Sequence, residues 1–108
     1  KIYFDTGKAT IKPESFPVLE AVAGILKANP EIKGVAIEGH TDDVGADARN
    51  LKLSDDRSKS VMAWLTSTGG VAADRLTAQG FGETRPAVEG KTKDAREANR
   101  RVEFLIKD

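Results

Sequence analysis

The sequence has no cysteine, a single histidine and no net charge. The absence of cysteine excludes a disulfide framework and a thiol nucleophile. Seventeen basic residues balance seventeen acidic ones. This balance argues against a general polyanion binder, because nucleic-acid-binding domains usually carry a basic excess. Apolar runs are only a few residues long, so we expect no segment to span a bilayer.

The remaining composition is that of an ordinary globular protein, with 39% hydrophobic and 31% charged residues in a chain of 108. A chain of this length suits one compact domain, and we expect residues 1–108 to form it. The sequence starts at Lys1 without a methionine or a signal peptide, and strand-forming residues follow at once. We therefore expect a domain taken from a longer protein.

Hydrophobic periodicity predicts alternating strands and helices. We expect strands over residues 2–4, 33–40, 75–81 and 102–106, and helices over 18–28, 48–68 and 92–99. Pro13 and Pro17 fit only near the start of the first helix, and Thr92 is a candidate N-cap for the last. This order predicts an α/β layer structure with helices packed on a sheet. The buried stripe of the second helix is expected to comprise Leu51, Leu53, Val61, Trp64 and Leu65.

The densest polar stretches are residues 40–43 and 50–57, and a metal site is one interpretation of them. An EF-hand loop starting at Asp43 fails, because Ala48 stands at its glycine position and Ser54 at its glutamate position. One histidine without cysteines argues against zinc. We therefore expect no metal and no cofactor.

Catalysis and nucleotide binding are two further interpretations. His40 would be the general base, but no Gly-x-Ser-x-Gly turn supplies a nucleophile. Acidic residues are plentiful, yet no pair is singled out for glycoside hydrolysis. The segment 80–82, Gly-Phe-Gly, lacks the third glycine of a dinucleotide fingerprint. We expect a protein that is not an enzyme, in which His40 ends a strand and hydrogen-bonds the neighbouring loop.

A fourth interpretation is recognition of a zwitterion. Asp42 follows a strand end and Arg57 lies in the next helix, so the two side chains can share a pocket. Arginine matches a carboxylate with a two-pronged hydrogen bond, and aspartate accepts from an ammonium. Spacing alone equally allows Asp42 and Arg57 to pair with each other or to cap the loop.

Several spaced motifs resemble the OmpA-like family of peptidoglycan-binding domains. The segment 39–45 resembles its Gly-His-Thr-Asp strand end, and the segment 50–57 resembles its Asn-x-x-Leu-Ser-x-x-Arg helix. Further matches are Phe4-Asp5, the segments 11–13, 74–76 and 80–83, Pro86, and the closing segment 99–103. The resemblance covers nearly the whole chain.

The resemblance implies an α+β sandwich of order βαβαβαβ, with a mixed four-stranded sheet. It also implies binding of peptidoglycan at the meso-diaminopimelate residue of the peptide stem, whose free end carries an ammonium and a carboxylate. Asp42 would take the ammonium and Arg57 the carboxylate. The supporting residues would be Thr41, Asn50, Leu53 and Arg100, with the first loop, Phe4, Asp5 and Thr6, lining the same pocket.

The same resemblance implies a location in the periplasm, as part of an outer-membrane or lipid-anchored protein of the cell envelope. The alternative function is a protein-interaction domain of an envelope complex that does not bind the wall. The sequence departs from the family pattern at Asp43, which adds negative charge beside Asp42 and could raise its pKa or weaken carboxylate binding. Gly90, Ala95 and Ser58 also replace residues that are common in the family.

Overall fold

A computed structural model of the chain describes residues 1–107. It contains three helices, α1 (Phe16–Ala28), α2 (Asp47–Ser67) and α3 (Lys93–Asn99). Its strands are β1 (Gly34–His40), β2 (Leu76–Gly80) and β3 (Arg101–Lys107), and short 3-10 turns precede α1 and β2. The bounds of these six elements lie close to the predicted ones. Thr92 caps α3 as expected, since its side-chain oxygen accepts a hydrogen bond from the Ala95 amide at 3.1 Å.

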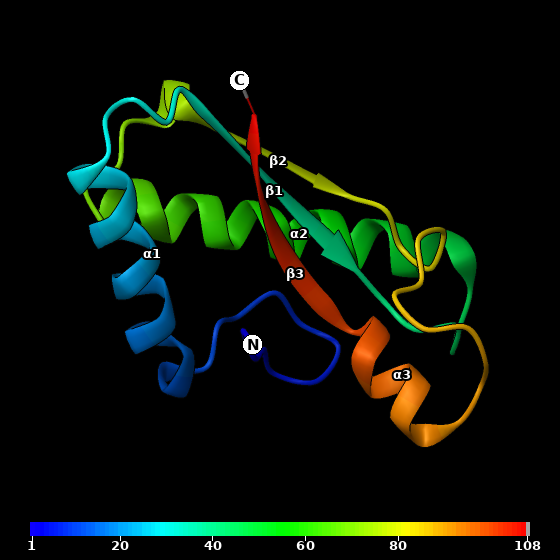
Figure 1. The fold of residues 1–108 in the computed structure, drawn as a ribbon. Coiled ribbons are helices and arrows are strands. Elements are labelled where there is room, and N and C mark those ends of the chain that lie inside the picture. Colours follow the sequence, from blue (N-terminus) through cyan, green and yellow to red (C-terminus); the bar gives the residue numbers. More distant parts are fainter. Residues whose placement is uncertain (108) are drawn as a thin grey trace.

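The three strands form one mixed sheet of order β2-β1-β3 (Figure 1). The central strand β1 runs parallel to β2 and antiparallel to β3. The mixed sheet was expected, but the prediction of four strands was wrong. Residues 3–5 pair locally with residues 10–12 instead, through one isolated bridge between Phe4 and Ile11. The Tyr3 amide also donates to Ser15 Oγ at 2.7 Å, which ties this segment to the turn before α1.

The hydrophobic core lies between one face of the sheet and the helices α1 and α2. Alternation along β1 sends Val35, Ile37 and Gly39 to this face, and Ile37 is fully buried there. Val61 and Leu65 of α2 and Leu19 of α1 complete its centre.

The stripe of α2 that faces the core was predicted correctly in its second half. Trp64 packs there against Phe16, with 6.0 Å between ring centroids. Earlier along the helix Ser54 and Ser58 are buried instead, whereas Leu51 is 49% exposed, so the prediction for Leu51 was wrong.

The first half of α2 approaches the sheet so closely that only glycine fits opposite it. A Cβ atom at Gly39 would lie 2.3 Å from the Ser54 carbonyl oxygen, and one at Gly80 would lie 2.1 Å from the Asp55 amide nitrogen. Two hydrogen bonds form across this short distance between α2 and the end of β2. The Gly80 amide donates to Asp55 Oδ1 at 3.0 Å, and the Gly82 amide donates to Ser54 Oγ at 2.9 Å. The helix is thereby fixed against the strand ends that carry the candidate site.

Candidate ligand-binding site

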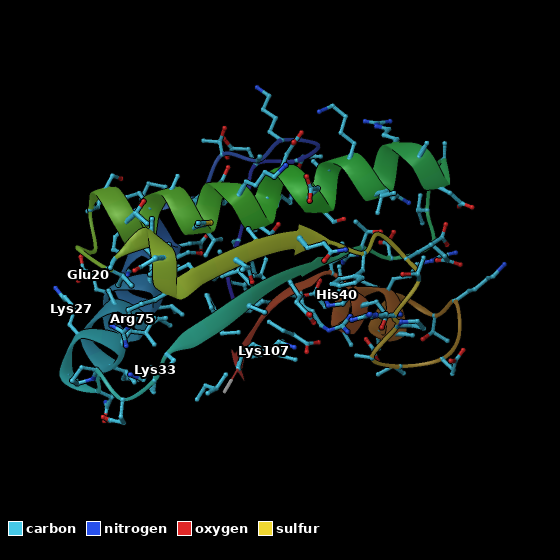
Figure 2. The ribbon with its side chains drawn as sticks, turned by 90° about the horizontal axis from the view of Figure 1, so that it is seen from above. Glu20, Lys27, Lys33, His40, Arg75 and Lys107 are labelled. Carbon is cyan, nitrogen blue, oxygen red and sulfur yellow. The ribbon has the colours of Figure 1, made fainter. Side chains whose placement is uncertain are left out.

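A cavity of about 470 Å³ lies where the ends of β1 and β3 and the first half of α2 meet the first loop. In Figure 1 this first loop, drawn in blue, passes between α1 and α3. Figure 2 places His40 at the same end of the sheet, beside α3, while Lys33 and Arg75 mark the opposite end. The cavity is lined by eight of the nine residues predicted for the ligand site: Phe4, Thr6, Thr41, Asp42, Asn50, Leu53, Arg57 and Arg100.

Asp5, the ninth predicted residue, does not line the cavity. Its side chain is exposed, and its contribution is a backbone one. The carbonyl oxygen of Asp5 accepts a hydrogen bond from Arg57 Nη2 at 3.3 Å. Asp5 therefore helps to place Arg57.

Asp42 presents an oriented carboxylate to the cavity. Its Oδ1 accepts a hydrogen bond from the Val44 amide at 2.9 Å. Its Oδ2 accepts from Arg100 Nη1 at 2.6 Å, and the Asp42 side chain is 12% exposed. Arg100 also donates to Glu97 at 2.6 Å. The hydrogen bond with Asp42 is the main cause that raises the pKa of Arg100.

Arg57 presents a guanidinium group that lacks a carboxylate partner among residues 1–107. Its Nε donates to the Lys8 carbonyl oxygen at 2.8 Å, and the group lies 4.9 Å from the centroid of the Phe4 ring. Burial lowers the pKa of Arg57, because desolvation is not offset by a nearby negative charge. The alternative that Asp42 and Arg57 pair with each other is wrong, since Asp42 pairs with Arg100.

Thr41 and Asn50 shape the loop that carries Asp42, and both are buried. The Thr41 amide donates to the Gly82 carbonyl at 2.8 Å, and its hydroxyl donates to the Asp42 carbonyl at 2.9 Å. Asn50 Nδ2 donates to the Val44 carbonyl at 3.0 Å. The loop can turn back toward α2 because Gly45 adopts a positive φ of 96°. These contacts hold Asp42 in place at the cavity.

Asp43 does not line the cavity. Two basic residues compensate the charge of its carboxylate. Arg96 Nε donates to its Oδ1 at 2.9 Å, and Lys91 Nζ lies 3.9 Å from its Oδ2. The hydrogen bond from Arg96 is the main cause that lowers the pKa of Asp43. The extra negative charge beside Asp42 is thus balanced within the protein.

Sequence reasoning did not assign a role to Asn99, which closes the loop between β2 and α3. Its Oδ1 accepts from the amides of Ala87 and Val88 at 2.8 and 2.9 Å, and its Nδ2 donates to the Val88 carbonyl at 2.9 Å. The signal available in the sequence was its position at the head of the Asn-Arg-Arg motif. Asn99 is buried, so its amide fixes this loop next to Asp42.

His40 does not hydrogen-bond the neighbouring loop, so that expectation was wrong. Both ring nitrogens are buried without a hydrogen-bond partner. The ring instead stacks on Phe81, with 5.6 Å between centroids, on the sheet face that is turned away from α2. The Arg85 guanidinium also lies over the Phe81 ring, 3.7 Å from its centroid. His40 therefore helps to position the loop after β2 by stacking on Phe81.

Two carboxylates accompany His40 on this sheet face, because Glu38 stands opposite Glu103 in the register of β1 and β3. Possible metal-ligating atoms of these three side chains lie within 4.8 Å of one another. Each carboxylate, however, already faces an arginine. Arg101 hydrogen-bonds Glu103, and Arg85 lies 3.8 Å from Glu38. The two guanidinium groups supply the positive charge that a cation would otherwise bring.

The burial of His40 predicts a loss of stability in weak acid. Desolvation is the main cause that lowers its pKa from the ordinary 6.5, and Arg101 and Arg85 act in the same direction against Glu103 and Glu38. The unfolded chain therefore binds the proton more readily than the folded one. The free energy of unfolding should fall as the pH drops below about 6.5 and level off below the folded-state pKa, with a slope of at most about 1.4 kcal/mol per pH unit.

Urea unfolding at pH 7.5 and at pH 5.5 measures this dependence. The variant His40→Gln serves as the control, because it keeps a polar side chain that does not titrate. We expect a smaller difference between the two pH values for the variant than for the wild type. Equal differences would show that His40 is not the titrating group.

The sequence pattern of the OmpA family matches residues 3–100. The chain belongs to the OmpA family. Among curated relatives, it is 41% identical to Photosystem I P700 chlorophyll a apoprotein A2 of Gloeobacter violaceus, over 98% of this chain and 13% of that protein. It is 39% identical to outer membrane porin F of Pseudomonas aeruginosa, over 97% of this chain and 30% of that protein. It is 36% identical to the peptidoglycan-binding protein ArfA of Mycobacterium bovis, over 97% of this chain and 32% of that protein. The chain thus spans a third or less of the length of these three relatives.

Solved structures of other proteins share the fold. The peptidoglycan-associated lipoprotein from Burkholderia pseudomallei superposes with a TM-score of 0.86 at 26% identity, over 98% of this chain and 88% of that one. The cell wall anchor of the T6SS from Pseudomonas aeruginosa superposes with a TM-score of 0.79 at 32% identity, over 95% of this chain and 73% of that one. Within residues 1–107, none of the helices has the length and apolar character needed to cross a membrane.

Proposed function

We propose that this OmpA-family domain binds peptidoglycan non-covalently, at the meso-diaminopimelate residue of the peptide stem. The observation that carries the proposal is the cavity that Asp42 and Arg57 line together. The two side chains offer opposite charges to one ligand. The free end of diaminopimelate carries the complementary ammonium and carboxylate.

The charges of the cavity support this choice of ligand. The partly buried Arg57 guanidinium hydrogen-bonds two backbone carbonyls and lies over the Phe4 ring, and it has no carboxylate partner within residues 1–107. An incoming carboxylate would supply the missing negative charge. Asp42 already accepts from Arg100 and Val44, but a carboxylate has about four acceptor positions. A ligand ammonium can therefore bind Asp42 while Arg100 stays in place.

The relatives support the same class of function and an envelope location. ArfA is named a peptidoglycan-binding protein, and one structural relative is a cell wall anchor. Another is a peptidoglycan-associated lipoprotein, and porin F is an outer-membrane protein. We infer that the domain works in the periplasm as part of a membrane-attached envelope protein. One small pocket gives modest affinity, and the repeating polymer raises the effective concentration of its ligand.

Co-sedimentation with purified sacculi of the meso-diaminopimelate type tests the proposal. We expect the wild type to pellet with the sacculi and the Asp42→Ala variant to stay in solution, because the variant cannot hold the ammonium. Lys52→Ala is the control, since Lys52 lies on α2 outside the cavity and pairs with Asp56. It should pellet like the wild type. A folded wild type that stays soluble would contradict wall binding and favour a protein partner.

A further inference from the structure

The cavity contains more positive charge than a simple zwitterion requires. Its charged lining residues are the basic Lys1, Arg49, Arg57, Arg100 and Arg101 and the acidic Asp42 and Glu97. Arg100 pairs with both acidic residues, and Lys1 contacts Glu97 at 2.8 Å. Arg101 pairs with Glu103 outside the cavity. Among residues 1–107, this leaves Arg49 and Arg57 as the two guanidinium groups of the cavity without a carboxylate partner.

The two unpaired arginines lie along one line on α2. Arg49, Leu53 and Arg57 follow each other at intervals of four residues, so they occupy one stripe of the helix. Eight residues of helix separate the Cα atoms of the two arginines by about 12 Å along the axis. Leu53 lines the cavity between them.

Both guanidinium groups also lie against the first loop. Arg57 donates to the Lys8 carbonyl oxygen. Arg49 Nη2 lies 3.8 Å from the position that a Cβ atom of Gly7 would occupy. Gly7 adopts a positive φ of 68°, and it lines the cavity together with Arg49. A ligand that extends from Arg57 along this loop therefore meets Arg49 next.

We propose that Arg49 forms a second carboxylate subsite, so that the preferred ligand carries two carboxylates for one ammonium. This inference rests on the proposed function and specifies its ligand class. The ligand would be a stem peptide that keeps a free carboxylate besides the one at the free end of diaminopimelate. A stem in which the other carboxylates are amidated would leave Arg49 without a partner.

Calorimetric titration with two synthetic tripeptides tests the second subsite. One is N-acetyl-L-alanyl-γ-D-glutamyl-meso-diaminopimelate, which has one ammonium and three free carboxylates. The other is its diamide, which keeps only the ammonium and carboxylate of the free end. We expect the wild type to bind the free acid about tenfold more tightly than the diamide, because one charge-assisted hydrogen bond is lost. The variant Arg49→Gln should bind both peptides with the affinity of the wild type for the diamide.

The outcomes separate this inference from the proposed function. If the wild type binds both peptides equally, the second subsite is wrong while the proposed function stands. The same holds if Arg49→Gln keeps the full preference for the free acid. If the folded wild type binds neither peptide, the proposed function fails and the second subsite fails with it. Lys52→Gln, which removes a positive charge from α2 outside the cavity, should keep the wild-type preference.

Discussion

Replacing Arg57 by glutamine is expected to weaken binding of a meso-diaminopimelate tripeptide by about 10- to 150-fold. The guanidinium group is the partner of the ligand carboxylate in this account, and a hydrogen bond between charged groups contributes about 1.5–3 kcal/mol. Every 1.4 kcal/mol corresponds to a factor of ten in affinity. Isothermal titration calorimetry of the two proteins with the same peptide measures the change.

The conservative variant Arg57→Lys separates charge from geometry. Lysine keeps the positive charge but offers no planar fork to a carboxylate, so we expect it to recover only part of the affinity. Because Arg57 also holds the first loop through the carbonyl oxygens of Lys8 and Asp5, the thermal stability of each variant must be checked. Unchanged affinity in a folded Arg57→Gln variant would remove Arg57 from the site.

Replacing Gly80 by alanine is expected to destabilise the fold by about 3 kcal/mol or more. The new Cβ atom would lie 2.1 Å from the amide nitrogen and 2.6 Å from the Cα atom of Asp55, both of which belong to the backbone of α2. Overpacking of a core commonly costs about 1–3 kcal/mol, and a backbone cannot turn aside as a side chain can. Moving α2 away would also break the hydrogen bond between the Gly80 amide and Asp55. Urea denaturation of both proteins gives the difference.

Gly24→Ala is the matched control for this prediction. Gly24 lies inside α1, and a Cβ atom there would meet nothing within 4 Å. Alanine is the better helix former, so this variant should be more stable than the wild type by about 0.5–1 kcal/mol. A Gly80→Ala variant that unfolds at the same urea concentration as the wild type would contradict the close contact between α2 and β2.

The helices and strands with strong hydrophobic periodicity could be predicted from the sequence. Which segments pair with each other could not, because pairing depends on contacts between residues that are apart in the sequence. Alternation of Val102, Phe104 and Ile106 marked β3, and Gly69 marked the end of α2. The segment around Phe4 has strand-forming residues but pairs with its own neighbour Ile11. Periodicity describes which residues are apolar and does not say which segment a strand meets.

The same limit applies to the buried face of α2. Leu51 has the right residue type for a core position but is exposed, and its Cα atom lies 3.2 Å from the position that a Cβ atom of Gly82 would occupy in the loop after β2. Ser54 takes the buried place instead, next to Gly39. Glycines spaced along two strands are a signal of such close packing, although one sequence does not show which helix they meet.

The candidate site could be located from its motifs, but its electrostatics could not. The motifs placed Asp42 and Arg57 near each other, and both line one cavity. The partner of Asp42, however, is Arg100, which is 58 residues away along the chain. The pairing of Asp43 with Arg96 and the stacking of His40 on Phe81 likewise depend on how the loops fold back.

The central claim is that Asp42 and Arg57 together hold the two charged groups at the free end of diaminopimelate. An NMR titration of the wild type tests it most directly, with one tripeptide that contains meso-diaminopimelate and one that contains lysine at the same position. Lysine keeps the ammonium but lacks the carboxylate. We predict that the diaminopimelate peptide shifts the signals of residues 41–45 and of Arg57 Nε–H, while the lysine peptide binds about tenfold more weakly and leaves the Arg57 signal unchanged. Equal binding of the two peptides, or an unshifted Arg57 signal with both, would contradict the claim.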